Sequence, residues 1–464
     1  MSRSRRGRQR LPSEPVNLSI DRLSHEGRGV ASNEGKIAFV EGALPGEQVT
    51  AVYTNRRSKY DELRLESLLT PAPDRTEPPC EFASICGGCV LQHLVPESQL
   101  SLKQQILADH LKHSGGISEY QHLPAMSADT LAYRRKARLA VRYVHKKGDV
   151  LVGFREKSSS FIADMESCQV LVAPVGNLIR PLRDLLMSMD GRRDIPQIEV
   201  AVGETKCVAD DDMSEVLKVA LVLRHLEPLS ESDLDRLRQF GEQHDIEWYL
   251  QSGGPDTVHR FWPDEEPSPL SYFLPDPLGD ITMHFQPGDF TQVNAQINRR
   301  MIRQALDLLD LQDSDRVLEL FCGLGNFTLP LARRAAHVVG VEGSAEMLTR
   351  AGENARRNDI HNVEYHVADL FTQFETGSWA DGSCNKLLLD PPRSGAIEVI
   401  SRIDELAPDV IVYVSCNPAT LARDAAELLR HGYRMTHAGI MDMFPHTAHV
   451  ESMARFEKVA SGRG

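Results

Sequence analysis

Short alternating segments dominate the first seventy residues. Apolar and polar side chains alternate over residues 16–20 and again over residues 49–53, the period of two that predicts strands. Glycine-containing turns at residues 26–29 and 44–47 separate these segments. Short strands joined by glycine turns predict a small all-β barrel of the OB type, a fold that often binds single-stranded nucleic acid.

A second alternating segment carries basic side chains. Its basic positions alternate with apolar ones and are Arg134, Lys136, Arg138 and Arg142. Gly148 and Asp149 separate it from an apolar segment at residues 150–154. The pattern therefore predicts a hairpin with its basic side chains on one face. Residues 180–260 look mixed α/β and carry no chemistry that the sequence identifies.

From about residue 290 the pattern changes to alternating strands and helices. Helical periodicity at residues 297–308 and 346–358 lies among short apolar runs. These runs are residues 316–320, 337–341, 363–367, 386–389 and 410–414. Such runs are typical of the middle of a parallel sheet, so we expect a Rossmann-like α/β domain here.

Proline-rich stretches divide the chain. Four prolines lie in residues 71–79 and six in residues 254–280. The predicted organisation is a basic disordered arm at residues 1–11, a barrel at 12–71, a central domain at 72–275 and an α/β domain at 276–464.

Charge is unevenly distributed. The 464 residues contain 52 Lys and Arg against 66 Asp and Glu, a net charge of −14, which argues against a nonspecific nucleic-acid binder. Residues 133–157, however, hold nine basic side chains and two acidic ones. We therefore expect the protein to bind a polyanion at a local basic surface. No apolar run reaches membrane-spanning length, and none follows the basic residues at the start, so we expect a cytoplasmic protein.

Three of the eight cysteines are clustered. Cys80, Cys86 and Cys89 lie within ten positions, and Cys168 beyond the basic segment is the natural fourth member of the set. A cytosolic chain would not use them as a disulfide framework. Zinc ribbons need two separate Cys-x2-Cys pairs, whereas one compact group with a remote partner is closer to iron–sulfur sites. Spacing alone leaves the two metals equally favoured.

The α/β region contains candidate cofactor residues. Residues 319–327 indicate a strand, a glycine turn and a helix start, and glycines 323 and 325 allow a ligand close to the backbone. Thr328 replaces the third glycine of the dinucleotide fingerprint, which suits a nucleoside cofactor without pyrophosphate. Glu342 ends the next strand, where an acid can bind a ribose diol, and Asp369 follows the third.

Two further strand ends carry reactive groups. Asp390-Pro391-Pro392-Arg393 lacks the Asn and the aromatic residue common in amino-methyltransferases, so amine methylation is disfavoured. Cys416 follows an apolar strand and precedes Asn417-Pro418, which places it in the crevice where parallel sheets bind ligands. Glu451 is a possible base near the C-terminus.

Together these motifs resemble the RNA uracil-C5 (m5U) methyltransferases. The matching segments are residues 290–294, 321–323, 390–393, 415–418 and 449–452. The barrel and the cysteine cluster favour the TRAM-containing type that modifies bacterial 23S ribosomal RNA, because the tRNA-modifying relatives lack both. The fold class that the resemblance implies is an N-terminal TRAM barrel, a central α/β iron–sulfur domain and a C-terminal class I methyltransferase domain.

The resemblance also implies roles for individual residues. Cys416 falls on the nucleophile and Glu451 on the general base. The positions that fall on the S-adenosylmethionine-binding residues are Gln292, Phe321, Asn326, Glu342, Asp369 and Asp390. The positions implied to hold a [4Fe-4S] cluster are Cys80, Cys86, Cys89 and Cys168.

The implied activity is methylation of C5 of a specific uridine in 23S ribosomal RNA. A cysteine thiolate adds to C6, C5 then takes the methyl group, and a base removes the C5 proton. The target base must leave its stack, and the barrel and basic hairpin would hold the surrounding RNA as the enzyme acts as a monomer. The site is expected to favour the thiolate.

Other functions remain possible from sequence. The closest alternative is a related enzyme acting on another ribosomal or transfer RNA uridine, or on two ribosomal uridines. A DNA cytosine-C5 methyltransferase would need Pro before the cysteine, where Ser415 stands. A radical methylthiotransferase would need Cys-x3-Cys-x2-Cys, but five residues separate Cys80 from Cys86. A non-catalytic RNA-binding module would not need the nucleophile and base.

Overall fold

The computed structural model describes residues 11–209, 212–265, 269–372 and 378–459. The predicted basic arm lies almost entirely outside these residues. The chain forms two compact units: the first comprises residues 1–84, 88–103 and 444–449, and the second comprises residues 85–87, 104–443 and 450–464. In the described residues, no helix is both long and apolar enough to cross a membrane.

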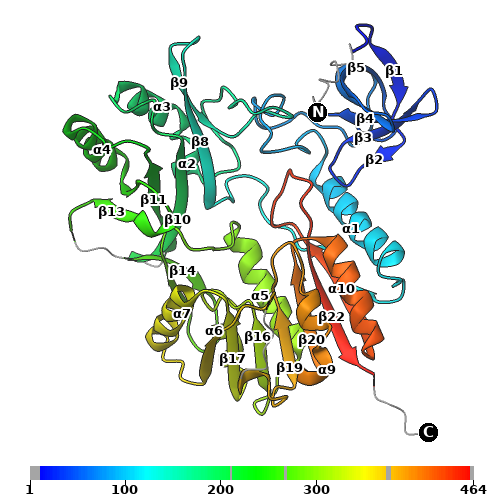
Figure 1. Cartoon of the computed structure of the whole chain (residues 1–464), viewed down its shortest axis with the longest axis vertical. Helices are drawn as coiled ribbons and strands as arrows, with labels where there is room; N and C mark the ends of the chain where they lie inside the picture. Colours follow the sequence, from blue (N-terminus) through cyan, green and yellow to red (C-terminus); the bar gives the residue numbers. More distant parts are fainter. Residues whose placement is uncertain (1–10, 210–211, 266–268, 373–377, 460–464) are drawn as a thin grey trace, which may run out of the picture. The chain divides into compact units, whose positions relative to one another are not determined.

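The first unit contains the N-terminal barrel (Figure 1, blue). Its strands are β1 (Val16–Ser19), β2 (Arg22–Leu23), β3 (Gly29–Asn33), β4 (Lys36–Glu41), β5 (Gln48–Arg56) and β6 (Tyr60–Thr70). They form one sheet in the order β1-β5-β6-β4-β3-β2. The alternating positions point inward as predicted, since Leu18, Val49 and Ala51 are buried in one apolar cluster. Helix α1 (Pro96–His113) follows the proline-rich stretch.

A six-stranded sheet forms the middle of the second unit. Its strands are β8 (Lys136–Val144), β9 (Asp149–Gly153), β10 (Gln197–Ala209), β11 (Asp212–Arg224), β12 (Ile246–Gln251) and β13 (His259–Trp262), in the order β13-β12-β11-β10-β8-β9. Its helices are α2 (Ala173–Gly176), α3 (Ile179–Ser188), α4 (Glu231–His244) and η1 (Pro255–Thr257). The predicted basic hairpin is confirmed as β8 and β9, which pair antiparallel.

An eight-stranded sheet forms the C-terminal α/β part (Figure 1, yellow to red). Its strands are β16 (Arg316–Leu320), β17 (His337–Glu342), β18 (Val363–Val367), β19 (Lys386–Leu389), β20 (Val410–Ser415), β21 (Tyr433–Met441), β22 (Glu451–Lys458) and the short β7 (Gln121–His122). The order is β18-β17-β16-β19-β20-β22-β21-β7. The first five are parallel, and β22 runs antiparallel between β20 and β21.

Helices pack against this sheet. They are α5 (Ala295–Leu309), α6 (Thr328–Ala332), α7 (Ala345–Arg357), η2 (Ser378–Ala380), α8 (Ile397–Ile400), α9 (Ile403–Leu406) and α10 (Pro418–Arg430). Helices α6 and α7 contact β17 and β18, whereas α5 contacts β20 and β22. A small hairpin, β14 (Leu270–Leu274) with β15 (Ile281–Phe285), lies between β10 and α7 and contacts both. The predicted helices and parallel strands are confirmed, and the carboxyl ends of β16, β17, β19 and β20 share one edge of the sheet.

Candidate functional site

The glycine loop after β16 turns sharply back toward β17. Phe321 has a φ of 66°, a value that a bulky side chain rarely adopts, and Gly323 and Gly325 have φ values of 56° and 90°. The Phe321 amide donates to the Val341 carbonyl at 2.9 Å, which fixes the loop to the end of β17. Strained backbone of this kind is concentrated at ligand sites, and here it supports the predicted cofactor loop.

The acid at the end of β17 faces this loop. One Glu342 carboxylate oxygen accepts from the Gly323 amide and the other from the Ser344 amide, both at 3.2 Å. The side chain remains partly exposed. Its place suits an acid that receives hydrogen bonds from ribose hydroxyls.

Asp369 lies in the exposed loop after β18. Its carboxylate accepts from the Thr372 hydroxyl at 2.5 Å and the Phe371 amide at 2.9 Å, and the Thr372 bond is the main reason its pKa is lowered. The Phe371 ring lies 5.5 Å from the Phe321 ring, so this loop neighbours the glycine loop. The carboxylate's own partners are local, and its contact with an adenine remains a prediction.

Asn326 is fixed from two other elements. It exchanges amide hydrogen bonds with Asn298 of α5 at 3.0 and 2.9 Å, and it accepts from the Tyr272 hydroxyl at 3.0 Å. Gln292 lines the same small hollow as Tyr272 and Asn298. Gln292 and Asn326 therefore share Tyr272 and Asn298 as neighbours, although more than thirty residues separate them in the sequence.

Two carboxyl groups at the centre of the sheet have raised pKa values. Burial raises the pKa of Glu319 to about 8, and the nearby carboxylates of Asp390 and Glu342 contribute to the increase. Glu319 accepts from the Thr328 hydroxyl at 2.6 Å. Burial also raises the pKa of Asp390 to about 7. Both groups can therefore hold protons near neutral pH.

Cys416 lies between the end of β20 and the start of α10. The next residue, Asn417, caps α10 by accepting from the Ala419 amide at 3.1 Å, and its side chain donates to the Arg393 carbonyl at 3.1 Å. The sulfur-bearing side chain is only partly buried. This capped turn holds the thiol at the carboxyl edge of the sheet.

The antiparallel strand β22 brings Glu451 to the same place. Ser415, the last residue of β20, pairs in register with Ser452 of β22. Because the strands are antiparallel, the residue after Ser415 and the residue before Ser452 come next to each other. These are Cys416 and Glu451, the predicted nucleophile and base.

The pKa of the Cys416 thiol is raised to about 11. Burial is the main cause, the Glu451 and Asp390 carboxylates add to it, and Arg393 opposes it. The expectation that the site favours the thiolate is therefore wrong for the protein by itself. Two carboxylates beside a partly desolvated sulfur disfavour a second negative charge.

The cysteine cluster receives no support from the structure. Cys86, Cys89 and Cys168 are buried and Cys80 is partly exposed. Cys80 and Cys89 belong to the first unit, whereas Cys86 and Cys168 belong to the second. In the part of the chain that the structure describes, no group of three or more His, Cys, Asp or Glu side chains could hold a metal ion. The predicted central iron–sulfur domain is thus not shown.

Several site residues were not identified from sequence. Tyr272 and Asn298 hold Asn326, but they lie in separate elements with no motif to connect them. Glu319 gave a usable signal, since it is an acid with apolar residues on both sides in its strand. Arg393 was part of a recognised motif, but its influence on Cys416 is visible only in the fold.

The strand order, the glycine loop and the acids at the carboxyl ends of the strands define a class I methyltransferase fold. Residues 278–459 match the family model described as tRNA (Uracil-5-)-methyltransferase, and residues 10–59 match the TRAM domain. A solved structure of a Pyrococcus abyssi tRNA (uracil-54, C5)-methyltransferase has the same fold, with a TM-score of 0.69 and 23% identity, over 95% of this chain and all of that one.

Curated relatives match over nearly the whole chain. The protein named 23S rRNA (uracil(1939)-C(5))-methyltransferase RlmD from Hahella chejuensis is 51% identical, covering 98% of this chain and 99% of the relative. The protein of the same name from Alcanivorax borkumensis is 49% identical with the same coverage. The chain belongs to the family of S-adenosylmethionine-dependent RNA uracil-C5 methyltransferases.

Proposed function

We propose that the protein methylates C5 of uracil 1939 in 23S ribosomal RNA, the nucleotide in the name of its relatives. The observation that supports the chemistry most directly is the placement of Cys416 next to Glu451, where β20 pairs with β22. The TRAM match supports RNA as the substrate. We propose that the protein acts in the cytoplasm as a monomer. It would rotate the target uracil out of the base stack into the active site.

Each catalytic residue has a separate task. C5 of uracil is a weak nucleophile, so Cys416 forms a bond to C6 and the electron pair moves to C5. Bound S-adenosylmethionine would supply an electrophilic methyl group to C5, with cleavage of its S–CH3 bond and S-adenosylhomocysteine as the leaving group. Glu451 then removes the C5 proton, the C5–C6 double bond re-forms, and the Cys416–C6 bond breaks.

The thiol must lose its proton before it attacks. Asp390 influences the sulfur and has a pKa of about 7, about four units below that of the thiol, so it accepts this proton only once the pKa of Cys416 has been lowered. The residues proposed to bind S-adenosylmethionine are Gln292, Phe321, Asn326, Glu342, Asp369 and Asp390. They would orient the adenosyl group toward Cys416.

Two variants separate the proposed roles. Cys416→Ala should bind RNA and S-adenosylmethionine but form neither adduct nor product. Glu451→Gln keeps the shape but loses the base, and a base step is worth about 10²–10⁴-fold, so methylated RNA should remain bonded to Cys416. A denaturing gel with labelled RNA shows the adduct as a shifted band. Normal turnover by Glu451→Gln would refute its role.

The target is tested by methyl transfer from labelled S-adenosylmethionine. Unmodified 23S ribosomal RNA should accept one methyl group at uracil 1939, and the same RNA with cytosine at that position should accept none. Transfer RNA is the control. Methylation of another ribosomal uridine, or of the transfer RNA, would favour the related-enzyme alternative.

We further propose that the four clustered cysteines hold a structural [4Fe-4S] cluster. Support comes from the family resemblance together with the thiol donor set, which is Cys80, Cys86, Cys89 and Cys168. Protein purified without oxygen should contain about four irons per chain, and Cys168→Ala should lose them. Stoichiometric zinc without iron would overturn this proposal.

A further inference from the structure

A basic hollow lies near the turn of the β8–β9 hairpin, away from the methyltransferase residues. Its volume is about 450 Å³. Its polar lining side chains are Arg142, Tyr143, His145, Arg155, Ser160 and Arg193. Within the described ranges no Asp or Glu lines it. A concave surface with several cations and no acid is suited to an anion.

The arginines that line this hollow form no ion pair with a carboxylate of the described residues. Elsewhere in the same sheet and its helices, Arg138 pairs with Glu199 at 2.7 Å and Arg183 with Asp149 at 2.7 Å. Among the described residues, no carboxylate forms an ion pair with Arg142, Arg155 or Arg193. In a chain of net charge −14, three uncompensated arginines around one hollow mark a place for an external anion.

Tyr143 contacts Arg193 of the hollow and the neighbouring Arg192. The guanidinium carbons of Arg192 and Arg193 lie 5.7 and 5.4 Å from the centre of its ring, within cation–π range. The His145 ring contacts the same tyrosine edge-on at 4.9 Å between centroids. The aromatic ring thus holds basic groups from two separate segments beside each other.

The segment that carries Arg192 and Arg193 is fixed at both ends. The buried carboxylate of Asp233 accepts from the Asp190 amide at 2.8 Å and the Gly191 amide at 2.9 Å. At the other end, the Pro196 carbonyl accepts from the Val141 amide of β8 at 2.9 Å. The backbone of this segment therefore does not have to be ordered when an anion binds, which lowers the entropic cost of binding.

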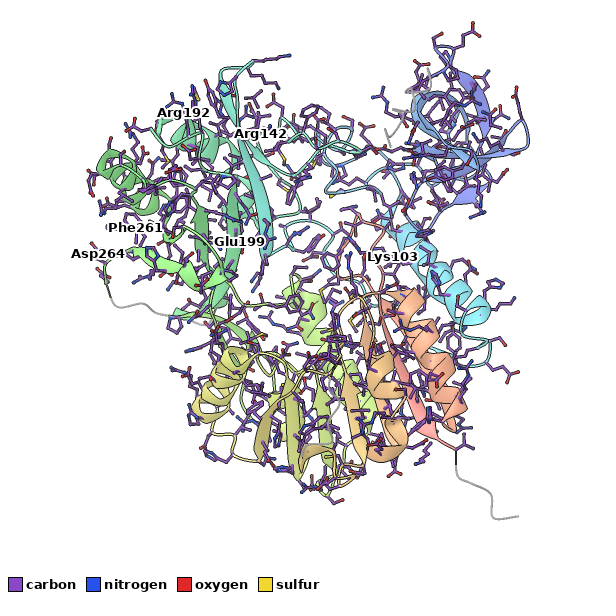
Figure 2. The ribbon with its side chains drawn as sticks, viewed as in Figure 1. Lys103, Arg142, Arg192, Glu199, Phe261 and Asp264 are labelled. Carbon is purple, nitrogen blue, oxygen red and sulfur yellow. The ribbon has the colours of Figure 1, made fainter. Side chains whose placement is uncertain are left out.

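We propose that this hollow binds backbone phosphate of the RNA substrate, through Arg142 and Arg193, outside the methylation site. The inference rests on the proposed function, which supplies a polyanionic substrate. Figure 2 shows Arg142 and Arg192 toward one end of the central sheet, with Glu199 further along it. Because Arg138 is paired with Glu199, only the part of the basic face near the hairpin turn acts as the phosphate contact.

The test compares two variants of the full chain with a 23S RNA fragment that contains the target uridine. Arg142→Gln combined with Arg193→Gln should raise Kd about tenfold at 0.1 M salt. It should also reduce the slope of log K against log salt by about 0.7–0.9 for each phosphate that the variant no longer neutralises. The control is Arg138→Gln, which removes one positive charge from the strand that carries Arg142. It should leave the slope near the wild-type value, whereas Arg142→Gln alone should reduce it.

Three outcomes would overturn the inference. An unchanged slope in the double variant, with the wild type still methylating the fragment, refutes the phosphate contact alone. An equal reduction of the slope in Arg138→Gln would show that loss of any positive charge has this effect, and not loss of a specific phosphate contact. Saturable binding of inorganic phosphate that disappears in the double variant, without a change in RNA slope, assigns the hollow to a small anion. If the wild type does not methylate the fragment, the proposed function itself fails.

Discussion

Ser415 and Ser452 face each other across the antiparallel pair β20–β22, and the Ser452 hydroxyl donates to the Ser415 carbonyl at 3.3 Å. This register makes Cys416 and Glu451 neighbours, although they are far apart in the sequence. Both serines are buried, so the pairing is protected from water. The relative position of nucleophile and base is therefore set by sheet register, which is more rigid than a loop.

The raised pKa of Cys416 predicts a pH dependence of thiol reactivity. Only the thiolate reacts with iodoacetamide, so with a pKa of about 11 the alkylation rate of Cys416 should rise about tenfold per pH unit from pH 7 to pH 10. An ordinary cysteine would level off near pH 8.5. Mass spectrometry of the peptide that contains Cys416 measures this rate.

A bound positive charge should lower the same pKa. S-adenosylmethionine carries a sulfonium charge, whereas S-adenosylhomocysteine lacks the transferred methyl group and this charge. We expect the first to shift the alkylation profile of Cys416 to lower pH and the second to leave its midpoint unchanged. Equal profiles with both compounds would show that the cofactor does not lie close enough to act on the thiol.

Glu319 should make stability depend on pH. Its pKa is about 8 in the folded protein and 4.5 as its ordinary value, so folding favours the protonated form. This contribution to stability is present below pH 4.5 and is lost as pH rises toward 8, by up to about 1.4 kcal/mol per pH unit. Glu319→Gln removes the carboxyl group and should be relatively more stable than wild type as pH rises.

The measurement is the difference in Tm between Glu319→Gln and wild type at pH 5.5 and at pH 8. The difference should shift in favour of the variant by several degrees at the higher pH. Glu398→Gln, a change of an exposed glutamate on α8, is the control and should show no such shift. A constant Tm difference for Glu319→Gln across this range would mean that the buried carboxyl is not protonated at neutral pH.

Local patterns predicted much of the fold. Alternation at residues 16–20 and in the basic segment predicted the strands β1 and β8, and the apolar runs predicted the parallel strands. These patterns worked because one-sided or complete burial leaves a period in the sequence. The glycine turn and Glu342 were correctly expected at strand ends, because both depend on positions close together in the chain.

The arrangement around Cys416 could not be predicted in the same way. Strand β22 was not recognised, and its insertion between β20 and β21 depends on contacts between distant segments. The high pKa of the thiol has the same origin, because Asp390 and Glu451 come from different strands. Asn326 was identified by family pattern, but its partners Tyr272 and Asn298 become visible only when β14 and α5 are placed.

A buried ion network should be important for stability. The side chain of Glu204 in β10 is fully buried. It forms ion pairs with Arg135 and with Arg299 of α5, the second at 2.5 Å. It also accepts a hydrogen bond from the Phe273 amide at 2.6 Å. Glu204→Ala leaves two poorly solvated arginines and a backbone amide without this partner. We expect a decrease of about 3–5 kcal/mol in the free energy of unfolding.

Denaturant unfolding of Glu204→Ala and Glu204→Gln tests this network. The glutamine variant keeps an oxygen acceptor for the amide but not the charge, so its decrease should be smaller. Arg180 offers a control, since its pairs with Glu166 and Asp184 are exposed and Arg180→Ala should change the free energy of unfolding little. Similar decreases for Glu204→Ala and Arg180→Ala would disprove the importance of burial.

Removal of residues 1–71 should weaken RNA binding without affecting the cofactor. The barrel has its own apolar core, which includes Leu18, Val40 and Leu63, and it contributes no predicted adenosyl contact. The truncated chain should bind S-adenosylmethionine with wild-type Kd in calorimetry, but its RNA affinity should fall and depend less steeply on salt, because phosphate contacts release counterions.

Circular dichroism melting of the truncated chain verifies that the remaining domains are folded. Equal salt slopes for the full and truncated chains would exclude the barrel as a phosphate contact, and a failure to bind S-adenosylmethionine would show that the barrel supports the catalytic domain instead.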